Sequence, residues 1–518
     1  MLVSTATPEF HSAQPASLPS QIHRGAYLLI LLVLAGSMAR LYRVSDPLKG
    51  FRPNDTAAMA RNFYEGSMNI LYPQVDWRGN SPGYVESEFP IYSFSIALLY
   101  RMFGVHEWLG KALTVGIYAL SAILLFKLSR RFFCESIGLL AVLYYTVAPL
   151  CFFYTRVFQP DALTALCSLA GVYYFWIWTE DGNKAALALS VAGVCLAVLL
   201  KPNTLYLGLP LLYLSYRKFG WQLLQRFDLW LISILVVTPS ILWYRHSFQL
   251  WQSYGNTFGV FGGWVKFQVF PPSLQLWPSV AKQLLLRLLF EIASPVGILL
   301  MAVGFSARPP HRNYFLHWWA IGFGISALIA AKGNQIHDYY QLPIVFVAVV
   351  WMAYGTNLLW RKELFSNSLA RAAIVAAICF VLGFSIRIWP TQVRIPHVET
   401  NRVAFAHEVQ QLTEPAALIL MVRPYRGLPA LYQHRTAQGE YLECDPVDFY
   451  RSHRKGWSLD DRQATPAFVE TLHGRGAKYF ATAFPEILDL HPDLKSTLDR
   501  SYTALDVNSN WAIYRLDH

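Results

Sequence analysis

Three carboxylic acids in this sequence stand in polar segments beside long apolar runs. They are Asp55, Glu88 and Asp161. A carboxylate can take a proton from a hydroxyl group, which is the task of a general base. Ionisable groups at membrane depth are costly unless they are paired or face a cavity, so these acids are candidates for function.

Cationic side chains recur in the same kind of position, at the ends of apolar runs. The candidates are Lys201, Arg245 and Lys332. Positive charge placed beside a departing phosphate stabilises the negative charge that grows on it. Acids and cations together therefore predict transfer chemistry with a phosphate leaving group.

Each candidate also has a structural interpretation. Asp55 precedes a helix-like stretch and can cap it. Asp161 follows Pro160 and can be a first-turn acid. Lys201 and Lys332 can extend from helix ends to the membrane surface, and His337 can be a surface residue at a turn. Both interpretations stay open for these residues.

Two glutamates, Glu86 and Glu88, are separated by one residue in the first polar segment. Glu86 is expected to be solvated. Glu88 directly precedes Phe89-Pro90 and is the better candidate for the site.

Charge is distributed unevenly along the 518 residues. Residues 1–389 hold 45 Asp, Glu, Lys and Arg, about 12%, whereas residues 390–518 hold 30, about 23%. Soluble domains carry about 25%. The first part therefore predicts a membrane module, and the second predicts a water-facing domain.

The net charge of +11 lies in the hydrophobic part and indicates membrane topology, so no nucleic-acid partner is expected. The six cysteines form no CxxC pattern, and glycine-rich phosphate loops are missing from the sequence. Soluble nucleotide-binding classes are thereby excluded.

About 20 apolar residues cross a bilayer core. Eleven runs of that order are found, at residues 25–41, 108–126, 136–154, 161–178, 185–200, 203–216, 229–244, 284–305, 315–331, 340–359 and 371–389. With the N-terminus in the cytoplasm, thirteen basic residues fall in cytoplasmic segments and three in short outer connections. That bias satisfies the positive-inside rule. The fold class predicted is an all-α polytopic membrane protein with a small C-terminal α/β domain.

The odd number of spans places the C-terminal domain outside the membrane. Residues 1–24 are rich in Ser, Pro and Ala and are expected to be disordered in the cytoplasm. The membrane module spans residues 25–389, with long outer loops at 42–107 and 245–283. Residues 390–518, with a helix expected across 468–483, form the extracytoplasmic domain.

Four segments in this order resemble the membrane glycosyltransferases with the C-type fold. They are RPNDTAAMARNF (52–63), ESEFPIYSFSIALLYRMFG (86–104), VFQPDALTAL (157–166) and HDYYQLPI (337–344). The resemblance is to the branch that holds protein O-mannosyltransferases and aminoarabinose transferases, and it covers about three quarters of the chain.

The resemblance implies roles for the candidate residues. Asp55, Glu88 and Asp161 match acidic positions of the catalytic site, and Asp55 would be the base. His337, Tyr340 and Arg61 would bind substrate. This chain has Phe89-Pro90-Ile91 where aminoarabinose transferases tend to have Lys-Pro-Pro. The three cations named above would then bind the donor phosphate.

The implied reaction moves a sugar from a polyprenyl-phosphate donor to an acceptor on the outer face, with inversion. The acceptor, a lipid, a glycan or a protein, is left open. So is a divalent metal ion bridging Asp55 or Glu88 to phosphate, because no firm ligand set is present. The loop at 251–277 would close over substrate. The expected location is a bacterial inner membrane. The alternatives are a transporter or flippase of lipid-linked saccharide and a saccharide ligase or polymerase.

Overall fold

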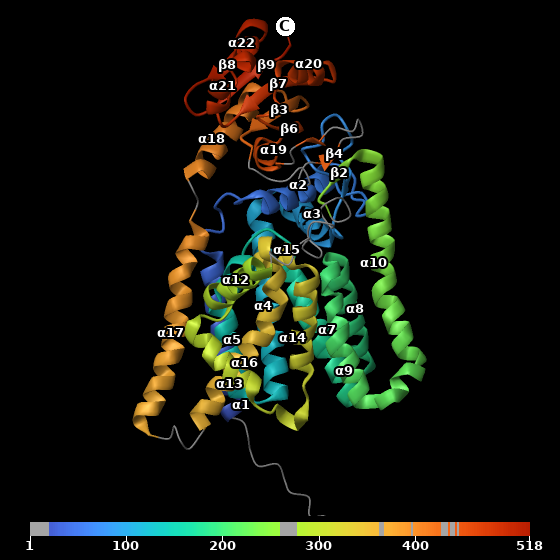
Figure 1. Cartoon of the computed structure of the whole chain (residues 1–518), viewed down its shortest axis with the longest axis vertical. Helices are drawn as coiled ribbons and strands as arrows, with labels where there is room; N and C mark the ends of the chain where they lie inside the picture. The colour runs from blue at the N-terminus through green and yellow to red at the C-terminus, as the bar shows by residue number, and fades with distance from the viewer. Residues whose placement is uncertain are drawn as a thin grey trace, which may run out of the picture.

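The computed structural model describes residues 20–259, 277–361, 367–394, 397–425, 434–435, 441–442 and 445–517. Long helices form a bundle, and the C-terminal part lies above one end of it (Figure 1). Within these residues, six helices are long and apolar enough to cross a membrane. They are α1 (Ser20–Leu41), α4 (Glu107–Phe132), α7 (Asp161–Asp181), α10 (Phe227–Tyr254), α16 (Leu342–Arg361) and α17 (Ser368–Val393).

Further helices complete the bundle. A bent pair, α12 (Trp277–Arg287) with the π-turn Leu288–Ile292 and α13 (Pro295–Ser306), turns through 100° and would make a seventh span. Short helices are α5 (Glu135–Val147), α6 (Pro149–Tyr154), α8 (Lys184–Leu200), η1 (Pro202–Leu207), α9 (Gly208–Phe219), η2 (Gly220–Gln225), η5 (Pro310–Arg312), α14 (Phe315–Ile329), α15 (Ala331–Ile336) and η6 (Asp338–Gln341).

Each of the eleven predicted apolar runs contains a helix, but the count of eleven full spans is supported only in part. Several runs are divided by a proline or shortened by a turn, as at Ala148-Pro149 and Lys201-Pro202. Proline lacks the N–H that an inner helical position must donate, so the helix ends there. Length and apolarity alone support six spans, or seven with the bent pair, among the described residues.

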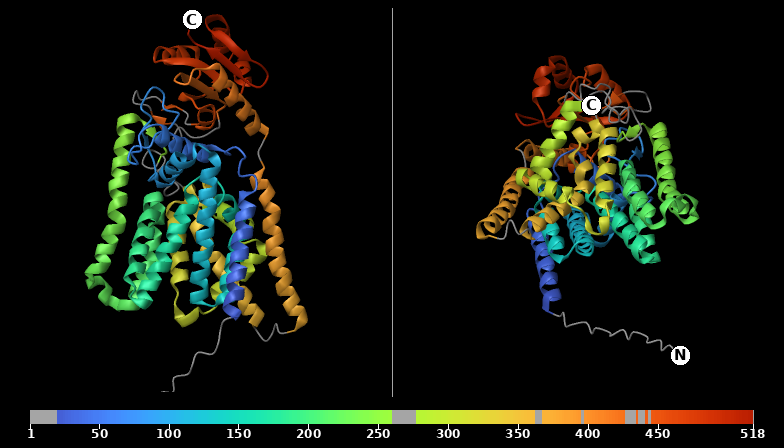
Figure 2. Two further views of the ribbon diagram at one scale, coloured as in Figure 1. Left: turned by 180° about the vertical axis from the view of Figure 1, so that it is seen from behind. Right: turned by 60° about the horizontal axis from the view of Figure 1, so that its bottom comes forward.

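Helices at the edge of the bundle differ from those at its centre. In α1 and α17, 17% of the apolar window is buried, and in α10 22%. The values for α4, α7 and α16 are 67%, 78% and 72%. In both views α10 and α17 flank the bundle on opposite sides (Figures 1 and 2). Their apolar side chains are therefore placed to face lipid.

The first outer segment forms a layer between the bundle and the C-terminal part. It contains α2 (Phe51–Glu65), β1 (Val85–Glu86) and α3 (Ile91–Phe103). The helix α2 begins at Phe51 after Gly50, so Asp55 lies in its second turn. The prediction that Asp55 caps this helix is wrong. Pro53 falls within the first turn, where backbone N–H groups have no helical partner and proline is tolerated.

The C-terminal part contains a five-stranded sheet of order β6-β3-β7-β9-β8. Strands β3 (Leu418–Arg423), β6 (Lys455–Asp460) and β7 (Ala477–Thr482) are parallel, whereas β9 (Ala512–Arg515) is antiparallel to β7 and β8 (Thr503–Val507). Helices are α18 (His397–Leu412), α19 (Val447–Ser452), α20 (Pro466–Gly474), α21 (Glu486–Leu490) and α22 (Pro492–Ser501). The stretch 468–483, predicted as one helix, divides into α20 and β7 because Gly476 turns the chain at φ 106°.

This sheet is joined to the first outer segment through main-chain hydrogen bonds. The Gly79 N–H donates to the Gly456 carbonyl over 2.7 Å, and the Gly456 N–H donates to the Asp76 carbonyl over 3.1 Å. A Cβ atom at Gly456 would lie 2.0 Å from the Ile419 carbonyl oxygen, so only glycine fits there. The Arg61 guanidinium adds a bond to the Tyr450 carbonyl, 2.8 Å long.

Candidate functional site

A buried lysine joins two of the predicted acids. The Lys201 Nζ lies 2.6 Å from Oε1 of Glu88 and 3.2 Å from Oδ1 of Asp161. The other oxygen of Glu88 pairs with Arg52, and the other oxygen of Asp161 accepts a 2.8 Å bond from Gln159. The side chain of Lys201 is 5% exposed. Two acids thus compensate the charge of a lysine that water hardly reaches.

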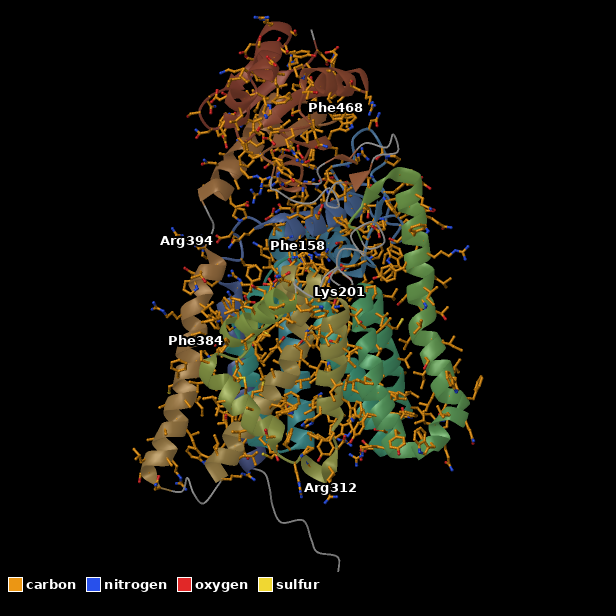
Figure 3. The ribbon with its side chains drawn as sticks, viewed as in Figure 1. Phe158, Lys201, Arg312, Phe384, Arg394 and Phe468 are labelled. Atoms are coloured by element: carbon orange, nitrogen blue, oxygen red, sulfur yellow. The ribbon has the colours of Figure 1, made fainter. Side chains whose placement is uncertain are left out.

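Breaks in two helices bring this lysine and its partners together. The helix α8 ends at Leu200, two residues before Pro202, and leaves Lys201 at its end. The helix α7 begins at Asp161, so this acid lies in the first turn. In Figure 3, Lys201 lies where the bundle meets the outer layer, and Arg312 lies at the opposite end. Glu88 comes from the outer layer itself, directly before α3.

Aromatic rings cover the lysine from the side of η6. The Lys201 Nζ is 4.8 Å from the ring centre of Tyr339 and 5.3 Å from that of Tyr340. His337 stacks on Tyr339 with ring centres 5.0 Å apart. A cation over an aromatic face is attracted by the ring quadrupole. The rings therefore hold positive charge where few water molecules can solvate it.

Arg287 of α12 fixes the segment that carries these rings. Its guanidinium donates to the carbonyls of Asn334 and Gln335, the latter over 2.8 Å, and to Oε1 of Gln341 over 3.2 Å. Tyr154 of α6 donates a 2.5 Å bond to Asp338. The position of η6 is thus set by buried polar contacts from two other helices.

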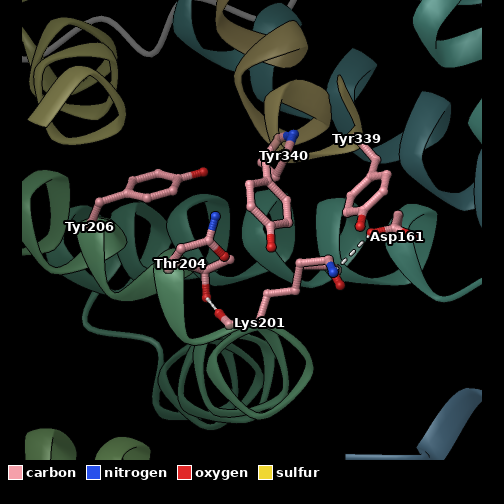
Figure 4. A pocket seen from close by; sticks show the side chains of 9 residues that line it. Asp161, Lys201, Thr204, Tyr206, Tyr339 and Tyr340 are labelled. Atoms are coloured by element: carbon pink, nitrogen blue, oxygen red, sulfur yellow. Dashed lines mark hydrogen bonds and ion pairs between the residues drawn. The ribbon is translucent and has the colours of Figure 1, made fainter. Parts of the chain in front are cut away.

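A small, partly open pocket borders this cluster (Figure 4). Its walls are formed by Asp161, Thr164, Lys201, Asn203, Thr204, Tyr206, Tyr339, Tyr340 and Pro343. Hydroxyl and amide groups, one cation and one acid share its surface. A mix of this kind suits a polar ligand that carries negative charge.

Asp55 lies apart from this cluster but is linked to it through α2. Its Oδ1 accepts a 2.8 Å bond from the Trp77 indole, while Oδ2 has no hydrogen-bond partner among the described residues. Arg52, which pairs with Glu88, is on the same helix three residues before Asp55. The structure thus brings Glu88 and Asp161 to one lysine, whereas Asp55 is linked to that group only through α2.

Burial and charge act differently on the pKa values of these acids. Burial raises the pKa of Asp55 well above that of an ordinary aspartate, although the Trp77 bond and the charge of Arg52 oppose the shift. Burial would raise the pKa of Glu88 too, but Arg52 and Lys201 outweigh it and hold that pKa below its usual range. Burial lowers the pKa of His337 to about 3, so this ring is neutral.

The remaining predicted residues have other surroundings. Arg245 is exposed on α10, which continues to Tyr254, so the outer loop predicted from residue 245 begins later. Lys332 of α15 donates a 2.8 Å bond to Gln335. Arg61 is buried and pairs with Asp76 at 2.7 Å. Residues 260–276 of the predicted loop at 251–277 lie outside the described residues, as do residues 1–19 of the N-terminal segment.

Glu86 is not solvated as predicted. It is fully buried, and its carboxylate accepts bonds from the Thr257 hydroxyl and from the Gly259 N–H, the latter 3.2 Å long. Its strand β1 pairs in parallel with β2 (Asn256–Thr257). The partner strand is about 170 positions away in the sequence, so no local pattern could reveal this burial.

Three residues of the site were missed by sequence reasoning. Arg52 precedes a proline and looks like part of a loop, and Gln159 carries no charge. Tyr339 stands beside Tyr340, and no local pattern distinguishes the two rings. The nearest signal was their occurrence inside the four motif segments.

A divalent metal ion is poorly suited to Glu88, one of the two predicted ligands. Both oxygens of Glu88 contact cations, and no cluster of three or more His, Cys, Asp or Glu suited to a metal is found in the part of the chain that the structure describes. The arrangement fits an anionic ligand at Lys201 better than a metal ion at Glu88.

Comparison with known families gives one partial match. A family model described as dolichyl-phosphate-mannose-protein mannosyltransferase matches residues 87–243. This range begins beside Glu88 and contains Asp161 and Lys201. None of the curated protein sequences matches the chain.

Solved structures share the fold over nearly the whole chain. ArnT from Cupriavidus metallidurans bound to undecaprenyl phosphate matches with a TM-score of 0.65 at 12% identity, covering 95% of this chain and 98% of ArnT. The oligosaccharyltransferase of Archaeoglobus fulgidus gives 0.57 at 12% identity, covering 94% of this chain and 72% of the other. The arabinofuranosyltransferase AftD from Mycobacteria gives 0.60 at 13%, with 95% and 40% covered.

These matches confirm the resemblance that the four sequence segments predicted. At such low identity they establish a common fold, whose known members include enzymes that transfer sugars. The chain is thus an integral, multi-pass membrane protein with the fold of the C-type membrane glycosyltransferases.

Proposed function

We propose that this protein transfers a sugar from a polyprenyl-phosphate donor to an acceptor on the outer face of a membrane. The observation that carries the proposal is the buried Lys201, held between Glu88 and Asp161 on the wall of a polar pocket. ArnT, which shares the fold, was crystallised with undecaprenyl phosphate. A lipid phosphate at Lys201 would leave its apolar tail beside the helices.

Lys201 is the candidate for binding the donor phosphate. Its ammonium group faces the pocket that Tyr339 and Tyr340 also line. In such a dry site a fixed positive charge stabilises the growing charge of a leaving group better than it does in water. Glu88 and Asp161 then act as positioning residues, because they hold the ammonium in place and keep it charged.

Asp55 is the candidate base. Of the three predicted acids, Glu88 and Asp161 each contact a cation, which makes a carboxylate a weak proton acceptor. Asp55 has one oxygen without a partner among the described residues, and burial raises its pKa. A carboxylate with a raised pKa takes up a proton more readily.

The reaction is a direct displacement at the anomeric carbon. The acceptor hydroxyl gives its proton to Asp55 while its oxygen forms the new bond to that carbon. The bond between the carbon and the phosphate oxygen breaks at the same time, and polyprenyl phosphate leaves beside Lys201. One such displacement inverts the configuration of the sugar.

The proposal includes the placement of the chain in a bacterial inner membrane. The N-terminus and residues 1–24 would lie in the cytoplasm, and residues 390–518 would form the outer domain over the module 25–389. Basic residues support this orientation, since Arg130 and Arg131 lie in the last turn of α4 and Arg312 lies at the end of the bundle away from the outer layer (Figure 3).

The test is a transfer assay with purified protein in lipid vesicles and radiolabelled polyprenyl-phosphate sugars. The label should leave the lipid fraction with the wild type and remain there with Lys201→Met. Lys184→Met is the matched control, because Lys184 is exposed at the other end of the same helix. Thermal unfolding of the same Lys201→Met preparation shows whether a loss reflects folding.

Three results would contradict the proposal. Label that crosses the bilayer while still attached to lipid would indicate a flippase, and labelled chains that grow in length would indicate a polymerase. Full transfer by Lys201→Met would remove the proposed phosphate site.

A further inference from the structure

The upper end of α10 contacts the main chain near each partner of the Glu88–Lys201 ion pair. This helix stands at the edge of the bundle (Figure 2). It buries one stripe of side chains at helical spacing. The stripe consists of Val236, Ser240, Trp243, Tyr244, Ser247 and Leu250. Its lower members are apolar or small, whereas Trp243, Tyr244 and Ser247 make polar contacts.

Ser247 and Trp243 hold the residue before Glu88. The Ser87 N–H donates to the Ser247 hydroxyl over 2.9 Å, and this hydroxyl donates back to the Ser87 carbonyl over 3.0 Å. The Trp243 indole donates to the same carbonyl over 3.1 Å. Ser247 is fully buried. Both polar groups of the Ser87 main chain are therefore bonded to α10.

Tyr244 holds the helix end that carries Lys201. Its hydroxyl donates to the Leu199 carbonyl over 2.9 Å, and the Phe89 N–H donates to the same carbonyl over 3.2 Å. This carbonyl is one of the last four of α8, which have no partner within their own helix. The end of α8 is thus joined both to α10 and to the residue after Glu88.

We propose that Trp243, Tyr244 and Ser247 are positioning residues that set the distance between Glu88 and Lys201. The inference rests on the proposed function, because it assigns the ion pair to phosphate binding. In the bonds described, the three side chains contact neither Glu88 nor Lys201. Their effect on the ion pair therefore passes through Ser87 and Leu199. A small displacement of reacting groups is costly even when the displaced residue is distant.

The experiment compares Ser247→Ala and Tyr244→Phe with Ser240→Ala. Ser240 lies two turns earlier on the same stripe, is buried, and has no hydrogen-bond partner among the described residues. We expect kcat to fall about ten- to a hundredfold in the first two variants. Ser240→Ala should transfer sugar at the wild-type rate. Wild-type kcat in both Ser247→Ala and Tyr244→Phe would overturn the inference.

A double-mutant cycle distinguishes positioning from general packing. In a Glu88→Gln background, Ser247→Ala should reduce kcat little further, because the ion pair it supports is already lost. Full additivity of the two losses would contradict the inference.

The same cycle in thermal unfolding needs no activity. Glu88→Gln should lower Tm more in the wild type than in Ser247→Ala. If transfer is absent while this coupling is present, the proposed function fails and the positioning role stands. If transfer depends on Lys201 but the coupling is absent, the positioning role fails and the proposed function stands.

Discussion

Two buried ion clusters of this protein each contain a cation between two acids but have different surroundings. In the site, Lys201 lies between Glu88 and Asp161. In the C-terminal part, Arg402 lies between Asp445 at 3.2 Å and Asp448 at 2.7 Å. Each cluster places one cation between two acids and excludes water from it.

The difference is in what the cations do besides pairing. Arg402 uses two nitrogens on the two oxygens of Asp448, at 2.7 and 2.8 Å, and so fastens α18 to α19. Lys201 presents a compact charge to a pocket and to two aromatic rings. Burial and pairing are thus common to structural and functional clusters. The adjoining space is what makes Lys201 a candidate for chemistry.

The largest effect is expected for the acid outside both clusters. Asp55→Asn should lower kcat by about 10²–10⁴-fold, because an amide cannot accept the proton of the acceptor. The measurement is the transfer rate at saturating donor lipid. Asp181→Asn, at the far end of α7, is the control and should be unaffected. Normal transfer by Asp55→Asn would exclude it as the base.

Lys201→Arg should keep the charge and still lose about a hundredfold in transfer. A planar guanidinium cannot place its charge as the compact ammonium does, and small misplacements are costly. Steady-state kinetics and the thermal unfolding of the same preparation check this. If Lys201→Arg has the wild-type kcat, the Lys201 cluster behaves like the structural cluster of Arg402.

The pH profile of the rate gives a further test. Asp55 must be ionised to accept a proton, and burial raises its pKa. The rate should therefore decline as pH falls through a value above the ordinary aspartate pKa of about 3.9. Each further pH unit should reduce the rate about tenfold. If the residual activity of Asp55→Asn declines at low pH in the same way, another group causes the decline.

Arg402→Lys should produce the opposite pattern to Lys201→Arg. Loss of the paired bonds to Asp448 should destabilise the C-terminal part by about 1.5–3 kcal/mol, the range for hydrogen bonds to charged groups. Denaturant unfolding of the whole protein measures this loss. Transfer per folded molecule should stay near the wild-type rate, and a drop comparable to that of Lys201→Arg would erase the distinction between the clusters.

The smallest effect is expected for the rings. Tyr339→Leu removes the aromatic face 4.8 Å from Lys201. A cation–π contact is worth about 0.5–2 kcal/mol, so the KM for donor lipid should rise several-fold while kcat changes less. Titration with donor lipid separates the two constants. An unchanged KM would leave the ring without a part in binding.

The sequence predicted the membrane bundle because apolar runs bounded by polar residues are a local pattern. It did not predict that the run at 136–154 breaks into two helices at Pro149, whereas the break at Lys201-Pro202 already separates two of the predicted runs. In the C-terminal part, the sequence predicted a small α/β domain without assigning individual strands. It merged α20 with β7, since both carry alternating apolar residues around a glycine-rich turn.

The candidate site was accessible only in part for the same reason. Glu88, Asp161 and Lys201 were named from the sequence because charge beside apolar runs is unusual. Their pairing depends on contacts between residues that are 40 and 113 positions apart, and the roles of Arg52 and Ser247 depend on contacts across 36 and 160 positions. The burial of Glu86 against β2 is likewise a long-range contact that spacing does not encode.

The most direct test of the account is the affinity of the purified protein for undecaprenyl phosphate in detergent. The wild type and Lys184→Met should bind this lipid equally, and Lys201→Met should bind it at least about tenfold more weakly, which corresponds to about 1.4 kcal/mol. Equal affinity of Lys201→Met and the wild type would contradict the claim that this buried lysine holds the lipid phosphate.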